Sequence, residues 1–287
     1  MPWAFHSLGN LYFDQGKMDE AEAMYQRALQ GYEKAWGPDH TSTLSTVNNL
    51  GLLYKAQGKM DEAEAMYQRA LQGKEKAWGP DHTSTFDTVN NLANLYKAQG
   101  KMDEAEAMYQ RALQGMEKAW GPDHTSTLST VNNLANLYTA QGKMDEAEAM
   151  YQRALQGMEK AWGPDHTSTL STVNNLANLY SDQGKMDEAE AMYQRALQGY
   201  EKALGAETFT RHRPALNTMQ NLADLRLRRG QRIAARELYI KACSGLELLL
   251  GPQNASVQSL HHTISHLERS GDPILSPTDK RDKQEKR

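Results

Sequence analysis

Asparagine is the residue with binding chemistry that recurs most regularly in this sequence. It recurs every 42 residues at Asn49, Asn91, Asn133 and Asn175, and again in the next repeat at Asn221. A second set lies about one helical turn further along the chain: Asn94, Asn136 and Asn178. A side-chain amide carries donors and an acceptor, so a row of amides can pair with an extended peptide backbone whatever its side chains. The alternative is that each asparagine bonds to a neighbouring repeat, because asparagine is a poor interior helix former and needs a compensating contact.

The repeats are nearly identical, so the few positions at which they differ are informative. Most of these positions lie in the first helix, and a group of them shares one helical face: Asp87, Asn94, Lys97, Thr139, Ser181 and Asp182. We predict that this face binds a peptide and that the varying residues set its specificity. Drift at solvent-exposed positions, where substitutions cost little, is the alternative interpretation.

Other charged and titratable residues support weaker hypotheses. The sixth repeat contains an arginine cluster, which could bind an acidic peptide, a phosphate or a nucleic acid, or could form the polar face of a capping unit: Arg211, Arg213, Arg226, Arg228, Arg229, Arg232 and Arg236. His262 and His266 have the i, i+4 spacing of a metal-ligand pair, but no Glu or Cys completes a site, so no metal is expected. One histidine lies in each linker, where a solvated or helix-capping role is expected: His40, His82, His124 and His166.

Catalytic chemistry has no support in the sequence. The patterns GxxxxGK[ST], HExxH and GxSxG are absent. The carboxylates Asp103, Glu104 and Glu106 recur in every full copy, which is typical of a helix start rather than of one catalytic pair. We therefore expect no enzymatic activity and no cofactor.

A repeating pair of helices must position these residues. In one copy, Val89, Leu92 and Tyr96 mark a first helix that ends at Gly100. A second apolar stripe follows, and the spacing of Asp103 and Glu106 predicts a capping box at its start. The tryptophan near the end of each second helix is expected to pack between repeats: Trp36, Trp78, Trp120 and Trp162.

These elements divide the chain into repeats and a tail. We predict repeats at about 1–40, 41–82, 83–124, 125–166, 167–208 and 209–252, a capping helix at 254–270 and a disordered polar tail at 271–287. The net charge of −4 argues against a general polyanion binder, and no apolar run is long enough to cross a membrane. A single cysteine, Cys243, excludes a disulfide framework, so a cytoplasmic location is expected.

The spacing Val89-x2-Leu92-Ala93-x2-Tyr96, followed by Ala105-x3-Tyr109-x2-Ala112, resembles the tetratricopeptide repeat. The 42-residue form resembles the repeats of kinesin light chains, and more closely the near-identical repeats of fungal NOD-like receptors. The resemblance implies a right-handed, all-α superhelix whose concave groove binds a protein or peptide segment, with asparagines at matching positions touching the ligand. It leaves two biological roles open: a cargo adaptor, or the ligand-sensing region of a receptor, as a detached piece or a fragment.

Overall fold

The computed structural model describes residues 1–269, and every regular element within them is an α-helix. The helices are α1 Pro2–Asp14, α2 Met18–Trp36, α3 Thr41–Ala56, α4 Met60–Trp78, α5 Thr83–Ala98, α6 Met102–Trp120, α7 Thr125–Ala140, α8 Met144–Trp162, α9 Thr167–Asp182, α10 Met186–Phe209, α11 Arg213–Arg228, α12 Arg232–Leu250 and α13 Ala255–Arg269. The predicted tail at 271–287 and the last residue of the predicted capping helix lie outside the described residues.

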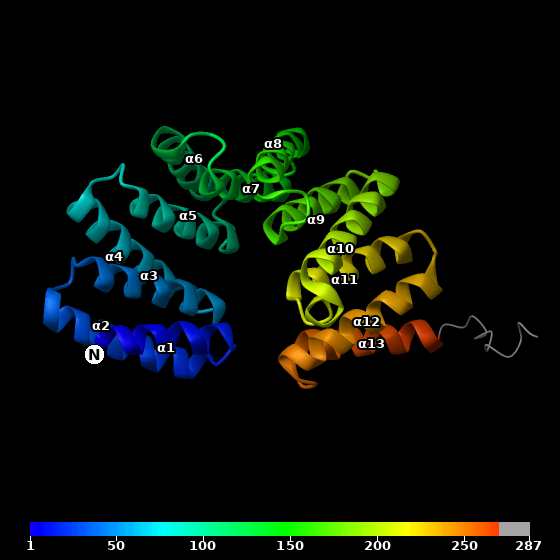
Figure 1. The fold of residues 1–287 in the computed structure, drawn as a ribbon, viewed down its shortest axis with the longest axis horizontal. Helices are drawn as coiled ribbons and strands as arrows, with labels where there is room; N and C mark the ends of the chain where they lie inside the picture. Colours follow the sequence, from blue (N-terminus) through cyan, green and yellow to red (C-terminus); the bar gives the residue numbers. More distant parts are fainter. Residues whose placement is uncertain (270–287) are drawn as a thin grey trace, which may run out of the picture. The chain divides into compact units, whose positions relative to one another are not determined.

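The chain forms two compact units, the first covering Met1–Ala161 and the second beginning at Trp162. In the first unit α1 packs on α2, α3 on α4 and α5 on α6, and α2, α4 and α6 each also contact the helix that follows. In the second unit α9 packs on α10 and α11 on α12, while α10 and α12 contact α11 and α13. Figure 1 shows these consecutive helix pairs within each unit. The predicted all-α solenoid of helix pairs is confirmed.

Neighbouring repeats share each apolar core. Between the second and third repeats, Ala63 and Tyr67 of α4 form one cluster with Leu92 and Leu95 of α5, all at most 2% exposed. A single helix pair would leave half of such a cluster in water, so the repeats stabilise one another.

Glycine ends each first helix as the sequence predicted. Gly100 has a φ of 78°, Lys101 N–H donates to the Tyr96 carbonyl at 2.9 Å, and Gly100 N–H donates to Lys97 at 3.1 Å. This is a Schellman motif, which favours glycine because its backbone is left-handed. The second helix starts one residue after Lys101, so the chain reverses within a tight turn.

The predicted capping box is wrong. Lys101, not Asp103, is the residue before α6, and no side chain caps that helix. Because the connection between α5 and α6 is so short, Asp103 already lies in the first turn of α6, where the positive end of the helix dipole stabilises its negative charge. Glu106 instead reaches the next repeat, accepting from Gln141 at 3.0 Å and Lys143 at 2.8 Å. These two donors hold the pKa of Glu106 below its usual value, although partial burial opposes them.

The linker histidines cap the first helices, as expected. Nδ1 of His82 accepts from the Ser84 backbone N–H at 3.2 Å, and the same bond recurs at His40, His124 and His166. The expectation that the tryptophans pack between repeats is wrong for three of the four: Trp36 is 54% exposed, and Trp120 and Trp162 are also exposed, whereas Trp78 is half-buried. Each second helix ends at its tryptophan, so the ring lies against the capping histidine of the linker rather than in the core, with ring centroids 4.5 to 5.2 Å apart.

The sixth repeat has the same helix pair as the others, although it contains an insertion and different residues at the contact with Glu190. Gly205, with φ 72° and ψ 160°, kinks α10, and the inserted residues extend that helix to Phe209. Arg226 stands where the other copies have tyrosine, and it joins Arg229 in binding Glu190, the equivalent of Glu106. Asn254 caps α13 through Ser256 N–H at 3.0 Å.

One repeat interface contains a buried cation. Lys74 is 5% exposed, and its Nζ donates to the Ser84 carbonyl at 2.9 Å and to Thr88 Oγ1 at 2.8 Å. The equivalent position in the next copy is Met116. Burial lowers the pKa of Lys74, and the negative charge of Asp87 opposes that shift.

We expect Lys74→Met to stabilise the chain by about 1 kcal/mol, because methionine fills the same space without desolvating a charge. The lysine is charged in both folded and unfolded chains below its lowered pKa, so the gain is largest there. It shrinks as the pH rises from that pKa to the unfolded value of 10.5. Urea-denaturation midpoints across this pH range measure it. Lys118→Met, at an exposed position, is the control and should change little. A lower midpoint for Lys74→Met would show that the lysine's two hydrogen bonds outweigh its desolvation.

A close approach of helices within a repeat gives a second prediction. A Cβ added at Gly115 of α6 would lie 1.9 Å from the Phe86 ring of α5. Alanine favours a helix interior by up to ~1 kcal/mol over glycine, but overpacking costs about 1–3 kcal/mol. Gly115→Ala should therefore lower the thermal midpoint. In a Phe86→Ala background the same change should raise it, and a loss of equal size in both backgrounds would refute the steric explanation.

Candidate functional site

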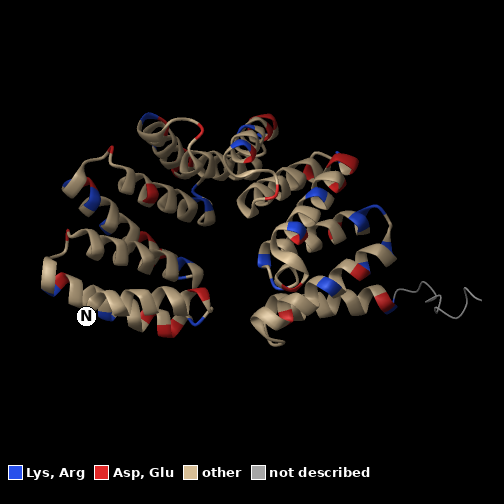
Figure 2. Cartoon of the chain, in the orientation of Figure 1, with Lys and Arg blue, Asp and Glu red and all other residues tan. Residues whose placement is uncertain are grey.

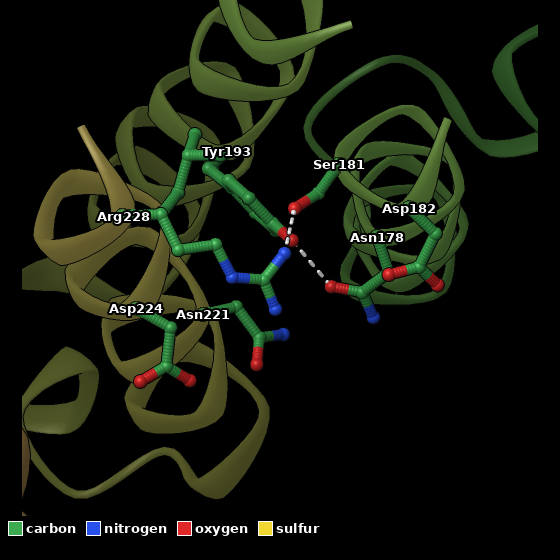
Figure 3. Close-up of a pocket in the computed structure, with 8 residues that line it drawn as sticks. Asn178, Ser181, Asp182, Tyr193, Asn221, Asp224 and Arg228 are labelled. Atoms are coloured by element: carbon green, nitrogen blue, oxygen red, sulfur yellow. Dashed lines mark hydrogen bonds between the residues drawn. The ribbon is translucent and has the colours of Figure 1, made fainter. Parts of the chain in front are cut away.

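A pocket of about 250 Å³ lies on the second unit, between α9 and α11 with α10 behind them. Its lining residues are Asn178, Ser181, Asp182, Tyr193, Asn221, Asp224, Leu225 and Arg228. Figure 3 shows the α9 side chains on one side of the pocket and those of α11 on the other. Four of the predicted site residues are therefore brought together: Asn178, Ser181, Asp182 and Asn221.

Tyr193 fixes the orientation of Asn178. Its hydroxyl donates to Asn178 Oδ1 at 2.5 Å (Figure 3), while the Asn178 amide nitrogen has no partner among the described residues. Burial raises the pKa of Tyr193, and the charge of Asp182 raises it further against the opposing charge of Arg228. The hydroxyl therefore stays protonated near neutral pH and remains a donor. The amide nitrogen of Asn178 is left as a donor available at the pocket.

Arg228 is held in place by a hydroxyl rather than by a carboxylate. Its Nη1 donates to Ser181 Oγ at 3.1 Å, and within residues 1–269 it forms no ion pair. Asp224 on the same helix accepts from the Tyr239 hydroxyl through Oδ1. Most of the guanidinium's five donors and one oxygen of Asp224 are therefore available to a ligand.

Asn221 links the pocket to the repeat before it. Its Nδ2 donates to Asn174 Oδ1 at 3.1 Å, so its own oxygen is the atom left without a partner. The pocket thus combines donors on Asn178 and Arg228 with acceptors on Asp182, Asp224 and Asn221. Such an arrangement can bind a group that both donates and accepts, such as a peptide unit.

The asparagines that recur with Asn221, namely Asn49, Asn91, Asn133 and Asn175, bond between repeats, as the alternative interpretation proposed. Nδ2 of Asn49 donates to Asn10, Asn91 to Asn48 and Asn133 to Asn90, at 3.1, 3.2 and 3.4 Å. Asn175 also has an interaction partner. These bonds occupy one side of each amide and explain why the asparagines recur. Peptide contact by the remaining atoms stays a prediction.

In the first unit, Asn94 and Asn136 repeat the geometry of Asn178. Their Oδ1 atoms accept from Tyr109 at 2.7 Å and from Tyr151 at 2.6 Å. The Asn94 nitrogen also donates to the carbonyl of Asn90 at 3.0 Å. Both amides therefore present a nitrogen on the half-buried face of their helix.

The other three predicted specificity residues of the first unit each have a different neighbour. Asp87 lies beside the buried Lys74. Thr139 donates its hydroxyl to the Ala135 carbonyl at 3.0 Å. Lys97 lies near Lys55 of the preceding repeat, and its pKa is lowered by burial and then by the charge of Lys55.

Sequence reasoning missed Tyr193, Asp224 and Leu225 as pocket residues, and it placed Arg228 only in the arginine cluster. Asp224 could have been found, because a step of 46 residues from Asn178 reaches it through the insertion in repeat six. The arginine cluster itself is largely paired: Arg226 and Arg229 bind Glu190, and Arg236 binds Glu268. Arg232 also has a partner.

Two classes of site receive no support from the described residues. No group of three His, Cys, Asp or Glu side chains within 1–269 is placed to hold a metal ion. None of the described helices is both long and apolar enough to span a bilayer.

The fold of this chain is similar to that of several solved structures. A crystal structure of nearly identical TPR-like repeats from a putative kinesin light chain of Podosopora anserina is 24% identical, with a TM-score of 0.59 over 71% of this chain and 96% of the other. BtubC from P. vanneervenii is 20% identical, with a TM-score of 0.62 over 86% and 92%. The apo form of the quorum sensor NprR from B. thuringiensis is 16% identical, with a TM-score of 0.67 over 97% and 72%.

The sequence itself gives the family. No curated protein matches it. The family model described as tetratricopeptide repeat matches residues 1–76, 84–160 and 126–202, more than half of the chain. The chain belongs to the tetratricopeptide repeat family.

Proposed function

We propose that this chain is a non-catalytic interaction module that binds an extended segment of another protein, anchored in the pocket between α9 and α11. The proposal rests chiefly on one observation: donors of Asn178 and Arg228 and acceptors of Asp182, Asp224 and Asn221 line the same pocket without satisfying one another. The repeat family, whose fold is typically that of protein-binding modules, supports it.

The bonding pattern favours recognition of the peptide backbone. A peptide unit presents one donor and one acceptor, and an extended chain leaves both unpaired. Asn178 Nδ2 and Arg228 can donate to a ligand carbonyl, while the oxygens of Asn221 and Asp224 can accept from a ligand N–H. Since Tyr193 and Ser181 hold Asn178 and Arg228 in place, little rotamer entropy is lost when the ligand binds.

Differences between repeats would then select the side chains of the ligand. Asp182 is exposed at the pocket, where its charge favours a basic residue. In the first unit, Lys55 and Lys97 are half-buried cations with no anionic partner among the described residues, and they favour an acidic residue. The ligand that we propose for the pocket of the second unit therefore combines backbone contacts with a basic side chain near Asp182.

The biological setting has two candidates. Similarity to the kinesin-light-chain repeats of Podosopora anserina favours an adaptor role. The ligand-sensing region of a fungal NOD-like receptor is the alternative, and it rests on the sequence resemblance alone. A cytoplasmic location remains part of the proposal in both cases.

The test begins with a phage-displayed pool of random linear peptides of roughly twelve residues. Arg228→Ala should weaken binding of a selected peptide by about 10-fold or more, since a hydrogen bond to a charged group is worth ~1.5–3 kcal/mol. Asn178→Ala should weaken it by about 2- to 10-fold, since a hydrogen bond between neutral groups is worth ~0.5–1.5 kcal/mol. Isothermal titration calorimetry measures the affinities. Gln198→Ala, at an exposed position of α10 outside the pocket, is the matched control and should bind like the parent chain.

The peptide can be varied in turn. Methylating the one backbone nitrogen that binds in the pocket should reduce affinity more than replacing that residue by alanine. A peptide whose binding is unaffected by both Asn178→Ala and Arg228→Ala would place the binding site elsewhere. Failure to select any peptide would contradict the proposed module.

A further inference from the structure

The outward face of α1 exposes leucines at positions that the next five first helices bury. Leu8 is 39% exposed and Leu11 is 50% exposed. A step of 42 residues takes them to Leu50 and Leu53 of α3, which are 2% and 0% exposed, and the equivalent leucines of α5, α7, α9 and α11 are at most 2% exposed. This face of α1 therefore has the residues of a helix interface, but no helix within residues 1–269 covers it.

In the later repeats a second helix covers these leucines. Ala21 and Tyr25 of α2 form one cluster with Leu50 and Leu53 of α3, and α4 forms the same cluster with α5. Alanine and tyrosine four residues apart lie on the same face of a helix. The helix that fits the exposed leucines of α1 therefore carries alanine and tyrosine at this spacing.

Residues that bind a glutamate in the later repeats have no carboxylate partner at the end of α1. In the second repeat three side chains donate to Glu22 of α2, at 3.3, 3.1 and 3.2 Å: Tyr54, Gln57 and Lys59. The same residue types occur 42 residues earlier: Tyr12, Gln15 and Lys17. Within residues 1–269 Lys17 forms no ion pair, and its Nζ lies over the Tyr12 ring, 5.6 Å from the centroid. This earlier group is therefore available to a glutamate of another helix.

Arg27 of α2 is a second cation without the partner that its equivalents have. In the next repeat Arg69 forms an ion pair with Glu33 of the preceding second helix, and the same pair recurs between α4 and α6 and between α6 and α8. Arg27 is exposed, lies over the Phe5 ring and forms no ion pair within the described residues. Figure 2 shows the basic and acidic residues of α1 and α2. Lys17 and Arg27 therefore provide two positive charges for a covering helix.

We propose that the outward face of α1 binds an amphipathic helix of a different protein, whose residues match the second helix of this repeat. Its alanine and tyrosine cover the exposed leucines. Two glutamates eleven residues apart, as Glu22 and Glu33 are, bind Lys17 and Arg27. Charge complementarity and continuity with the interface repeated along the chain both identify this occupant. A second copy fits less well, because its α2, α4, α6, α10 and α12 are already packed on the first helix that follows each of them.

A synthetic peptide with the sequence of residues 18–40 is the probe, because it contains the helix that covers α3. An isolated helix of this length is largely unfolded in water. Replacing Gln30 of the peptide by Glu and joining it through a lactam to Lys34 favours the helical form, and both positions are exposed in α2.

Isothermal titration calorimetry of the full chain with this peptide should show saturable binding of one peptide per chain. The surface is separate from the pocket, to which α1 contributes no residue, so the variant Arg228→Ala should bind the probe as the parent chain does. Failure to bind the probe, or loss of binding in Arg228→Ala, would overturn the proposal without affecting the function proposed for the pocket.

Leu8→Asp tests the apolar contact. It should weaken binding of the probe by about 10-fold or more, because it places a charge in the covered face. Leu52→Asp is the matched control, since Leu52 of α3 is also 39% exposed and lies outside this face. The control should bind like the parent chain, and circular dichroism checks that both variants fold. An equal loss of affinity in the two variants would contradict the assignment of the site to α1.

A charge exchange tests the orientation of the bound helix. Arg27→Glu in the chain should weaken binding by about 3- to 10-fold, because two like charges then face each other. Glu33→Arg in the peptide restores opposite charges and should recover most of the loss. Without that recovery, the helix does not lie on α1 as α2 lies on α3, and the proposal is wrong.

The chain alone should remain monomeric in sedimentation equilibrium up to roughly 200 µM. A dimer that Leu8→Asp dissociates would make a second copy the occupant of this face and would overturn the assignment to a different protein.

Discussion

The requirement that each helix pair bury its apolar stripe against the next pair governs this molecule. Tyr67 and Ala63 of one repeat and Leu92 and Leu95 of the next form one core, and the same residues recur down the chain. Because this packing fixes most positions of the repeat, the copies differ at few positions, most of them on the first-helix surface and some in the core, as with Lys74 and Met116. We propose that the exposed positions among them give individual repeats their separate binding properties.

Polar contacts between repeats use residues that a single repeat would leave unsatisfied. Glu106 binds the turn of the following repeat through Gln141 and Lys143, and Arg226 and Arg229 preserve the equivalent contact in repeat six, where the tyrosine is lost. The asparagine pairs serve the same purpose on the first helices. These contacts also orient the amides, so the residues that stabilise the array prepare the surface that we propose binds peptide.

The regular features of the fold could be predicted from the sequence, because periodic apolar residues and turn glycines act locally. The start of the second helix could not be predicted, because the short turn at residues 99–101 ends at Lys101, which places Asp103 inside the helix and leaves Glu106 to bind the neighbouring repeat. The exposure of Trp36 depends on where the second helix stops relative to the linker, which spacing alone does not specify. Half of the pocket residues were predicted, namely the α9 residues and Asn221. Asp224 was missed although the lengthened step in repeat six leads to it, and Tyr193 was missed because it lies in a buried stripe.

The central claim is that the free amide nitrogen of Asn178 binds the backbone of an extended ligand. Side-chain amide resonances of a ¹⁵N-labelled chain, followed while a selected peptide is added, test this most directly. The account predicts that the Asn178 and Asn221 side-chain signals shift in proportion to occupancy while that of Gln198 stays in place. Saturable peptide binding that leaves the Asn178 and Asn221 signals unmoved would contradict it.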